Sequence, residues 1–136
     1  MPTDAASPTA RTPTTAYEAI GGAENIAKLV NRFYDLMETD PAYARLRAIH
    51  AADLAPMRVS LAGFLTGWMG GPRDWFDARE NTCMMTLHSR FKIDQGLADD
   101  WAGAMGRALD DTGVDPEFAG QMREIIKRLC AGMVNT

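Results

Sequence analysis

Histidine is the side chain best suited to bind a metal ion or move a proton near neutral pH, and this sequence contains two, His50 and His88. His88 follows an apolar stretch and precedes Phe91 and Ile93, so we expect it to be half buried. Such an imidazole can bind a metal ion, or it can be an ordinary histidine with a satisfied hydrogen bond. Because no acidic residue lies directly beside it as a second ligand, residue chemistry alone favours the ordinary histidine. His50 lies in a predicted loop, where a solvated side chain is the simplest interpretation.

Motifs for several enzyme classes are absent from the sequence. There is no Gly-x-Ser-x-Gly elbow, no P-loop, no His-Glu-x-x-His pair and no dinucleotide-binding glycine fingerprint. The adjacent carboxylates Asp99-Asp100 and Asp110-Asp111 point in different directions on a helix, so we expect solvated faces rather than acid–base pairs. Cys83 and Cys130 lack the spacing of a zinc site. They are expected to be reduced thiols, with a disulfide between them as the alternative.

The composition is that of a globular domain. The 136 residues are 46% apolar and 24% charged, a chain long enough to bury a core without disulfides or metal clips. The formal net charge of −4 argues against nucleic acid and anionic membrane surfaces as partners. No apolar run is typical of a signal peptide or long enough to span a bilayer. We therefore expect a cytoplasmic protein.

The elements that must position these side chains are helices. Residues 1–16 are mostly Thr, Ala and Pro and predict a flexible tail before a single domain at 17–136. From Glu24 to Glu38, apolar residues recur at steps of three and four, which indicates an amphipathic helix after the break at Gly21-Gly22.

Further helix signals follow along the chain. Residues 73–82 have no clear period and predict a loop, and no alternating strand pattern or repeat is present. The fold class is therefore predicted to be all-α. The other expected helices cover 41–49, a segment capped by Asp53 that ends at Gly70-Gly71-Pro72, 83–89, a segment from an Asp94 cap to Gly113, and a last segment opened by Asp115-Pro116.

The order of short motifs along the chain carries a family resemblance. The sequence reads YEAIGG at 17–22, NRFYDLM at 31–37, LRAIH at 46–50, GWMGGP at 67–72 and LHSRFKI at 87–93, followed by Trp101. Each motif is short, but their joint order and spacing are specific. From residue 17 to about 134 the chain resembles the truncated haemoglobins of the second group. The resemblance implies a two-over-two helical sandwich around haem b, iron protoporphyrin IX.

The resemblance implies a role for each matching residue. His88 matches the proximal histidine, which binds the haem iron through a neutral imidazole. Tyr34 and Trp101 match distal donors that hydrogen-bond the ligand, and His50 matches a variable distal position that would add a third polar group. Met57 and Leu61 match distal-helix positions facing the ligand. The other residues that would line the porphyrin are Phe33, Phe64, Leu65, Trp68, Met84, Phe91 and Ile93.

The sequence also departs from the family pattern. Members often carry a basic residue just before the proximal histidine, where this chain has Leu87. Leu87 cannot make the usual charged contact to a haem propionate, and Arg79, Arg90 or Trp75 are the candidates to replace it. Met57 is bulkier than the small residue often found at its position, which would restrict a distal route to the iron.

The resemblance implies binding of dioxygen, nitric oxide, carbon monoxide or similar small ligands. The family's functions share one site: oxygen transport or storage, nitric-oxide oxidation, peroxide chemistry and sensing. A haem-dependent dioxygenase or peroxidase-like activity is therefore an open alternative. The sequence also leaves open whether a reductase is a partner and whether the protein is a monomer or a homodimer. Three candidate donors argue for slow oxygen release, which weakens a transport role. Two alternatives remain: a cofactor-free helical interaction module, and direct binding of the iron by His50 or, less favoured, Met57.

Overall fold

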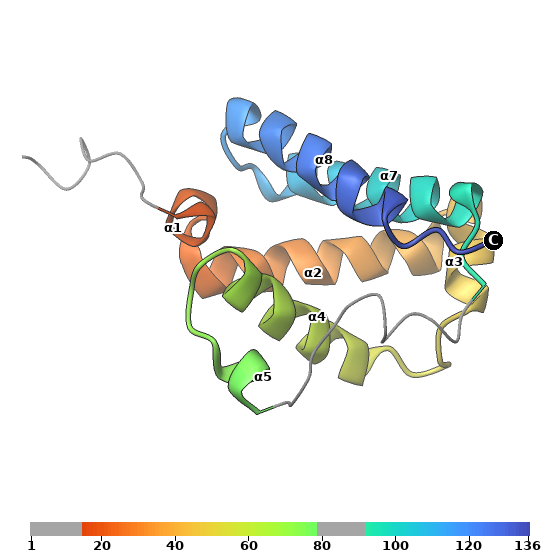
Figure 1. Cartoon of the computed structure of the whole chain (residues 1–136), viewed down its shortest axis with the longest axis horizontal. Helices are drawn as coiled ribbons and strands as arrows, with labels where there is room; N and C mark the ends of the chain where they lie inside the picture. The colour runs from red at the N-terminus through yellow and green to blue at the C-terminus, as the bar shows by residue number, and fades with distance from the viewer. Residues whose placement is uncertain (1–14, 79–91) are drawn as a thin grey trace, which may run out of the picture.

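The computed structural model describes residues 15–78 and 92–136, and in these two ranges the regular structure is helical (Figure 1). No strand occurs in either range. The helices, in chain order, are α1 (Ala16–Ile20), α2 (Gly22–Thr39), the 3₁₀ turn η2 (Pro41–Tyr43), α3 (Ala44–Ala48), α4 (Ala55–Trp68), α5 (Asp74–Asp77), α7 (Gln95–Thr112) and α8 (Pro116–Ala131).

Helix α2 lies at the centre of the fold. It packs against α7 on one side and α4 on the other, while α8 covers α7 and α5 packs on α4 (Figure 1). Its apolar residues recur at the spacing of one helix face and are at most 2% exposed, among them Ile26, Leu29, Val30 and Met37. Because this face is buried, the rotation of α2 about its axis is fixed, and Phe33 and Tyr34 lie in the interior.

Two predicted caps are confirmed and one is wrong by a residue. The Asp94 carboxylate accepts from the Leu97 N–H at 2.8 Å, and Asp115 accepts from the Phe118 N–H at 3.1 Å. At the start of α4 the cap position is Leu54. Asp53 lies one residue earlier and accepts from the Ala55 N–H at 3.0 Å.

The predicted loop at 73–82 is wrong for its first half, because α5 forms there. Gly63 and Gly67 on α4 leave room for the two aromatic side chains of α5. A Cβ atom on Gly63 would lie 2.8 Å from the Trp75 ring, and one on Gly67 would lie 2.5 Å from the Phe76 ring. The helix therefore depends on packing against α4, which a search for periodicity within 73–82 cannot detect.

Helix α1 was also not predicted. It is capped by Thr15, whose hydroxyl accepts from the Glu18 N–H at 3.1 Å. It ends at Gly21, whose φ of 104° is accessible to glycine at little cost. The Tyr17 N–H donates to the Met69 carbonyl at 2.9 Å, which ties α1 to the end of α4.

The large apolar residues of α8 are only partly buried. Ile126 and Met122 are 3% exposed, whereas Ile125 is 40% exposed and faces solvent. Within residues 15–78 and 92–136, no helix combines the length and apolar character needed to cross a bilayer.

Candidate functional site

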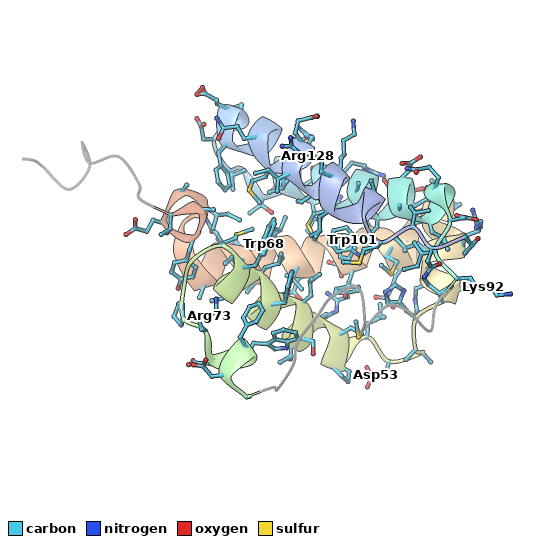
Figure 2. The ribbon with its side chains drawn as sticks, viewed as in Figure 1. Asp53, Trp68, Arg73, Lys92, Trp101 and Arg128 are labelled. Carbon is cyan, nitrogen blue, oxygen red and sulfur yellow. The ribbon has the colours of Figure 1, made fainter. Side chains whose placement is uncertain are left out.

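Three elements bring a row of aromatic side chains together in the interior. Phe33 and Tyr34 come from α2, Trp101 from α7, and His50 follows α3. The Phe33 ring centroid lies 4.8 Å from that of Trp101 and 4.9 Å from that of Tyr34. The Tyr34 and His50 rings meet edge to face at 6.1 Å. Figure 2 shows Trp101 between α7 and α2. The structure thus brings the three predicted distal residues into one cluster around Phe33.

Tyr34 carries the most distinctive polar group of this cluster. The residue is 2% exposed, and no residue in 15–78 or 92–136 forms a hydrogen bond with its hydroxyl. Burial raises the pKa of Tyr34 to about 12, and the nearby charge of Arg58 acts in the opposite direction. The phenol is therefore protonated at neutral pH and able to donate to a ligand that enters the cluster.

His50 is oriented by the helix that precedes it, α3. Its Nδ1 atom lies 2.8 Å from the carbonyl oxygen of Leu46. Because a carbonyl only accepts, Nδ1 carries the proton of this hydrogen bond. In the neutral imidazole, Nε2 then has a lone pair and accepts, and it becomes a donor only when the ring is protonated. Neutral His50 therefore differs from Tyr34 and Trp101, whose O–H and N–H groups donate.

Trp101 is partly buried and packed against the core. Its indole N–H is a donor without an acceptor function. Among the residues that the structure describes, none accepts a hydrogen bond from it. Together with the Tyr34 hydroxyl, it gives the cluster two donors in an apolar setting.

Helix α4 and α5 supply a second group of aromatic rings. Phe64 is stacked on Trp68 at 6.1 Å, with 16° between the ring planes, and meets Trp75 edge to face at 5.7 Å. Phe64 is 6% exposed, and Figure 2 shows Trp68 on the side of α4 that faces α2. These three predicted haem contacts are therefore close neighbours.

The remaining predicted contacts on the described chain differ in burial. Leu65 is 2% exposed and Ile93 is 8% exposed, while Leu61 is partly buried against the core. Met57, which the resemblance places facing the ligand, is 38% exposed. An exposed thioether at this position leaves apolar surface that the described part of the chain does not cover.

Five predicted site residues lie outside the described residues. These include His88, the predicted iron ligand, and both arginines predicted near a propionate. The five are Arg79, Met84, His88, Arg90 and Phe91.

Two arginines near the cluster were missed by sequence reasoning. Arg47 donates to the carbonyls of Ala51 and Ala52 at 3.0 and 2.9 Å and so holds the loop that follows His50. Arg58 on α4 hydrogen-bonds to α2 beside Tyr34. Its partners recur on one face of α2, and that spacing is the signal from which the contact could have been suspected.

The chain is similar to known proteins along nearly its whole length. The profile of the family described as Bacterial-like globin matches residues 15–135. The chain is 31% identical over 110 residues to the group 2 truncated hemoglobin YjbI of Bacillus subtilis (strain 168), which covers 81% of this chain and 77% of that protein.

Solved structures of truncated haemoglobins are also similar to this chain. The cold-adapted truncated hemoglobin of the Antarctic marine bacterium Pseudoalteromonas haloplanktis TAC125 matches with a TM-score of 0.87 and 32% identity, over 90% of this chain and 99% of that one. The group II 2-on-2 hemoglobin of Agrobacterium tumefaciens matches with a TM-score of 0.86 and 34% identity, over 92% and 97% of the two chains.

Proposed function

Because the chain belongs to the bacterial-like globin family, as a group II truncated haemoglobin, we propose that it binds dioxygen and related diatomic molecules at haem and releases them slowly. Membership of the family confirms the expected all-α two-over-two fold and implies haem-based binding of small ligands. The identity of the ligand, the rate of its release and the roles of single residues are the proposal.

The observation that carries the proposal is the state of Tyr34. The Tyr34 side chain is almost wholly buried, and its protonated hydroxyl has no hydrogen-bonding partner among the described residues, so it can donate to an acceptor that enters the cluster. A diatomic ligand with partial negative charge is such an acceptor. The Trp101 ring, like that of Tyr34, contacts Phe33, and its indole N–H supplies a second donor. Both donors would slow the ligand's departure.

The apolar surroundings fit a large flat cofactor. One aromatic group is formed by Phe64, Trp68 and Trp75. Met57 lies on α4, as Phe64 and Trp68 do, and presents apolar surface to solvent. We assign these residues, with Phe33, Leu61, Leu65 and Ile93, to the porphyrin contacts. Bound haem would supply an iron atom that can take up a diatomic molecule, and His88 is our proposal for the residue that would hold that iron. Arg79, Arg90 and Trp75 stay the candidates for the propionates.

His50 has a different role from the two neutral donors. With Nδ1 bonded to Leu46, its neutral ring offers only an acceptor at Nε2, so beside Tyr34 it would not donate to a partly negative ligand. When protonated, it would donate. Slow release favours redox chemistry or sensing over oxygen transport.

Absorbance spectra of the purified protein test the cofactor. We expect ferric and ferrous haem bands and a shift of the ferrous bands on addition of carbon monoxide. In His88→Ala the five-coordinate ferrous spectrum should be lost. A low-spin ferric spectrum that disappears in His50→Ala would instead make His50 an iron ligand. A colourless protein that takes up no added haemin would contradict the proposal.

Stopped-flow measurement of dioxygen release tests the role of Tyr34. Tyr34→Phe removes only the hydroxyl, and loss of one hydrogen bond of about 1 kcal/mol predicts roughly fivefold faster release. Tyr43→Phe is the matched control, because Tyr43 is also a buried tyrosine, 7% exposed, but its hydroxyl lies near Arg107 outside the cluster. Fast release that is the same in wild type and Tyr34→Phe would contradict the proposed role.

A further inference from the structure

Arg58 joins helix α4 to α2 at the level of Tyr34. Its Nη1 atom donates to the carbonyl oxygen and to the Oδ1 atom of Asn31, both at 3.1 Å. Its Nη2 atom donates to Asp35 Oδ1 at 3.0 Å and to Glu38 Oε1 at 3.2 Å. Since residues at such spacings of three and four share one face of a helix, a single guanidinium contacts three successive positions along α2.

The same guanidinium covers the ring of Tyr34. Its central carbon lies over the ring, 5.6 Å from the centroid, which is within the range of a cation–π interaction. The Arg58 side chain is 24% exposed, so solvent screens this contact less than it screens a pair on the open surface. The hydrogen bonds to α2 leave the guanidinium little freedom to move away from the ring.

We propose that Arg58 is a positioning residue for Tyr34: held by α2, its guanidinium fixes the orientation of the Tyr34 ring and strengthens the hydroxyl as a hydrogen-bond donor. The inference rests on the proposed function, in which that hydroxyl donates to the ligand. A cation over an aromatic face draws electron density from the ring and its oxygen, and this strengthens the O–H group as a donor. The direction of the pKa agrees, because the charge of Arg58 lowers the pKa of Tyr34 against the larger effect of burial.

Arginine suits this role for a geometric reason. Its planar fork presents several N–H groups at fixed angles, so the side chain can hold two carboxylates and a carbonyl while its flat face lies on a ring. A lysine keeps the charge but offers a single ammonium with freely rotating donors. The two side chains therefore separate the contribution of charge from that of fixed orientation.

Arg107 provides a matched control elsewhere in the fold. It lies over the ring of Tyr43 at 5.7 Å and donates to Asp40 Oδ2 at 2.5 Å, so it also joins two elements and covers a buried tyrosine. Tyr43 is not part of the aromatic cluster of Phe33, Tyr34, His50 and Trp101. Loss of Arg107 should therefore reproduce the structural effect of losing Arg58 without reaching the donor.

The experiment compares Arg58→Met, Arg58→Lys, Arg107→Met, Tyr34→Phe and the double variant Arg58→Met with Tyr34→Phe, in the full-length protein. A first readout is independent of haem: NMR spectra with labelled tyrosine rings. We expect Arg58→Met to move the Tyr34 ring signals and leave those of Tyr43, Arg107→Met to do the reverse, and Arg58→Lys to cause a smaller shift at Tyr34.

The second readout is dioxygen release in a double-mutant cycle. From the strength of an exposed to half-buried cation–π contact, Arg58→Met should accelerate release roughly two- to fivefold when Tyr34 is present. It should have little effect when Tyr34 is phenylalanine, because the donor is then absent. A purely structural clamp would give the same acceleration in both backgrounds and would overturn the inference.

The two proposals fail in different ways. If Tyr34→Phe does not change dioxygen release, or the protein binds no haem, the proposed function fails. The NMR signals of the tyrosine rings then still decide whether Arg58 fixes the orientation of the Tyr34 ring. If Tyr34→Phe accelerates release and Arg58→Met does not, the inference about Arg58 fails alone. Should Arg58→Met not fold, Arg58→Lys in the same cycle decides: unmoved Tyr34 signals and unchanged release would overturn the inference.

Discussion

Ile93 and Asn135 form a reciprocal pair of hydrogen bonds that ties the C-terminus to the segment before α7. The Ile93 N–H donates to Asn135 Oδ1 at 2.8 Å, and the Asn135 N–H donates to the Ile93 carbonyl at 2.9 Å. Ile93 is 8% exposed and is one of the proposed porphyrin contacts. The last residues of the chain therefore help to hold one wall of the candidate site.

The first prediction concerns this pair. Asn135→Ala leaves the partly buried Ile93 N–H without its side-chain acceptor, which should lower the free energy of unfolding by about 1–2 kcal/mol in urea titrations. Asn135→Asp keeps an acceptor oxygen in the same place and should lose less. Equal losses in the two variants would mean that the hydrogen bond to Ile93 contributes nothing measurable.

The second prediction concerns the close approach of α4 and α5. Gly63→Ala would drive a methyl group against the Trp75 ring, so it should lower the free energy of unfolding by about 1–3 kcal/mol. The matched control is Gly120→Ala on α8, where an added Cβ meets nothing within 4 Å. There the higher helix propensity of alanine should raise stability by about 0.5–1 kcal/mol. Stabilisation by Gly63→Ala would show that α5 is free to move away.

These cases show what local sequence could and could not predict about the fold. The caps Asp94 and Asp115 act on backbone N–H groups within three residues, so their helices could be predicted from sequence. Helix α5 owes its place to two glycines on another helix, which no window over its own residues contains. Asp53 was placed one residue wrong because a carboxylate just outside a helix can reach the first N–H group as well.

The sequence likewise predicted only part of the candidate site. The residue types of Tyr34, His50 and Trp101 pointed to a site only through the family resemblance, because an aromatic at helical spacing is usually core. The proton of His50 is set by the carbonyl of Leu46, a contact that the sequence pattern does not reveal. Arg58 was missed because its partners on α2 lie 20 to 27 residues away in sequence.

The third prediction is a loss of stability at alkaline pH caused by Tyr34. Burial raises the pKa of Tyr34 from 10.0 to about 12 in the folded protein, so the unfolded chain ionises first as the pH rises. The contribution of Tyr34 to the free energy of unfolding is fully present below pH 10 and is lost as the pH passes through about 12. Over this window the free energy of unfolding should fall by about 2–3 kcal/mol, and Tyr34→Phe should remove that part of the decline.

Cys130 gives the comparison for this measurement. Burial raises the pKa of its thiol from 9.0 to about 11, with a further effect of Asp99 in the same direction. Its contribution should therefore be lost at lower pH than that of Tyr34. Urea titrations between pH 8 and pH 12 on wild type, Tyr34→Phe and Cys130→Ala separate the two groups, and a Tyr34→Phe curve parallel to wild type would contradict the prediction.

The fourth prediction concerns the indole N–H of Trp101. Trp101→Phe keeps an aromatic ring beside Phe33 but removes the donor, so dioxygen release should be roughly three- to tenfold faster, as expected for one hydrogen bond. Trp68→Phe is the comparison for packing, since Trp68 is a proposed porphyrin contact that stacks on Phe64 and lies outside the donor cluster. In the double variant with Tyr34→Phe, two donors to one ligand should show coupling rather than simple additivity. Faster release in Trp68→Phe than in Trp101→Phe would show that cavity packing, and not hydrogen bonding from the indole, controls the rate.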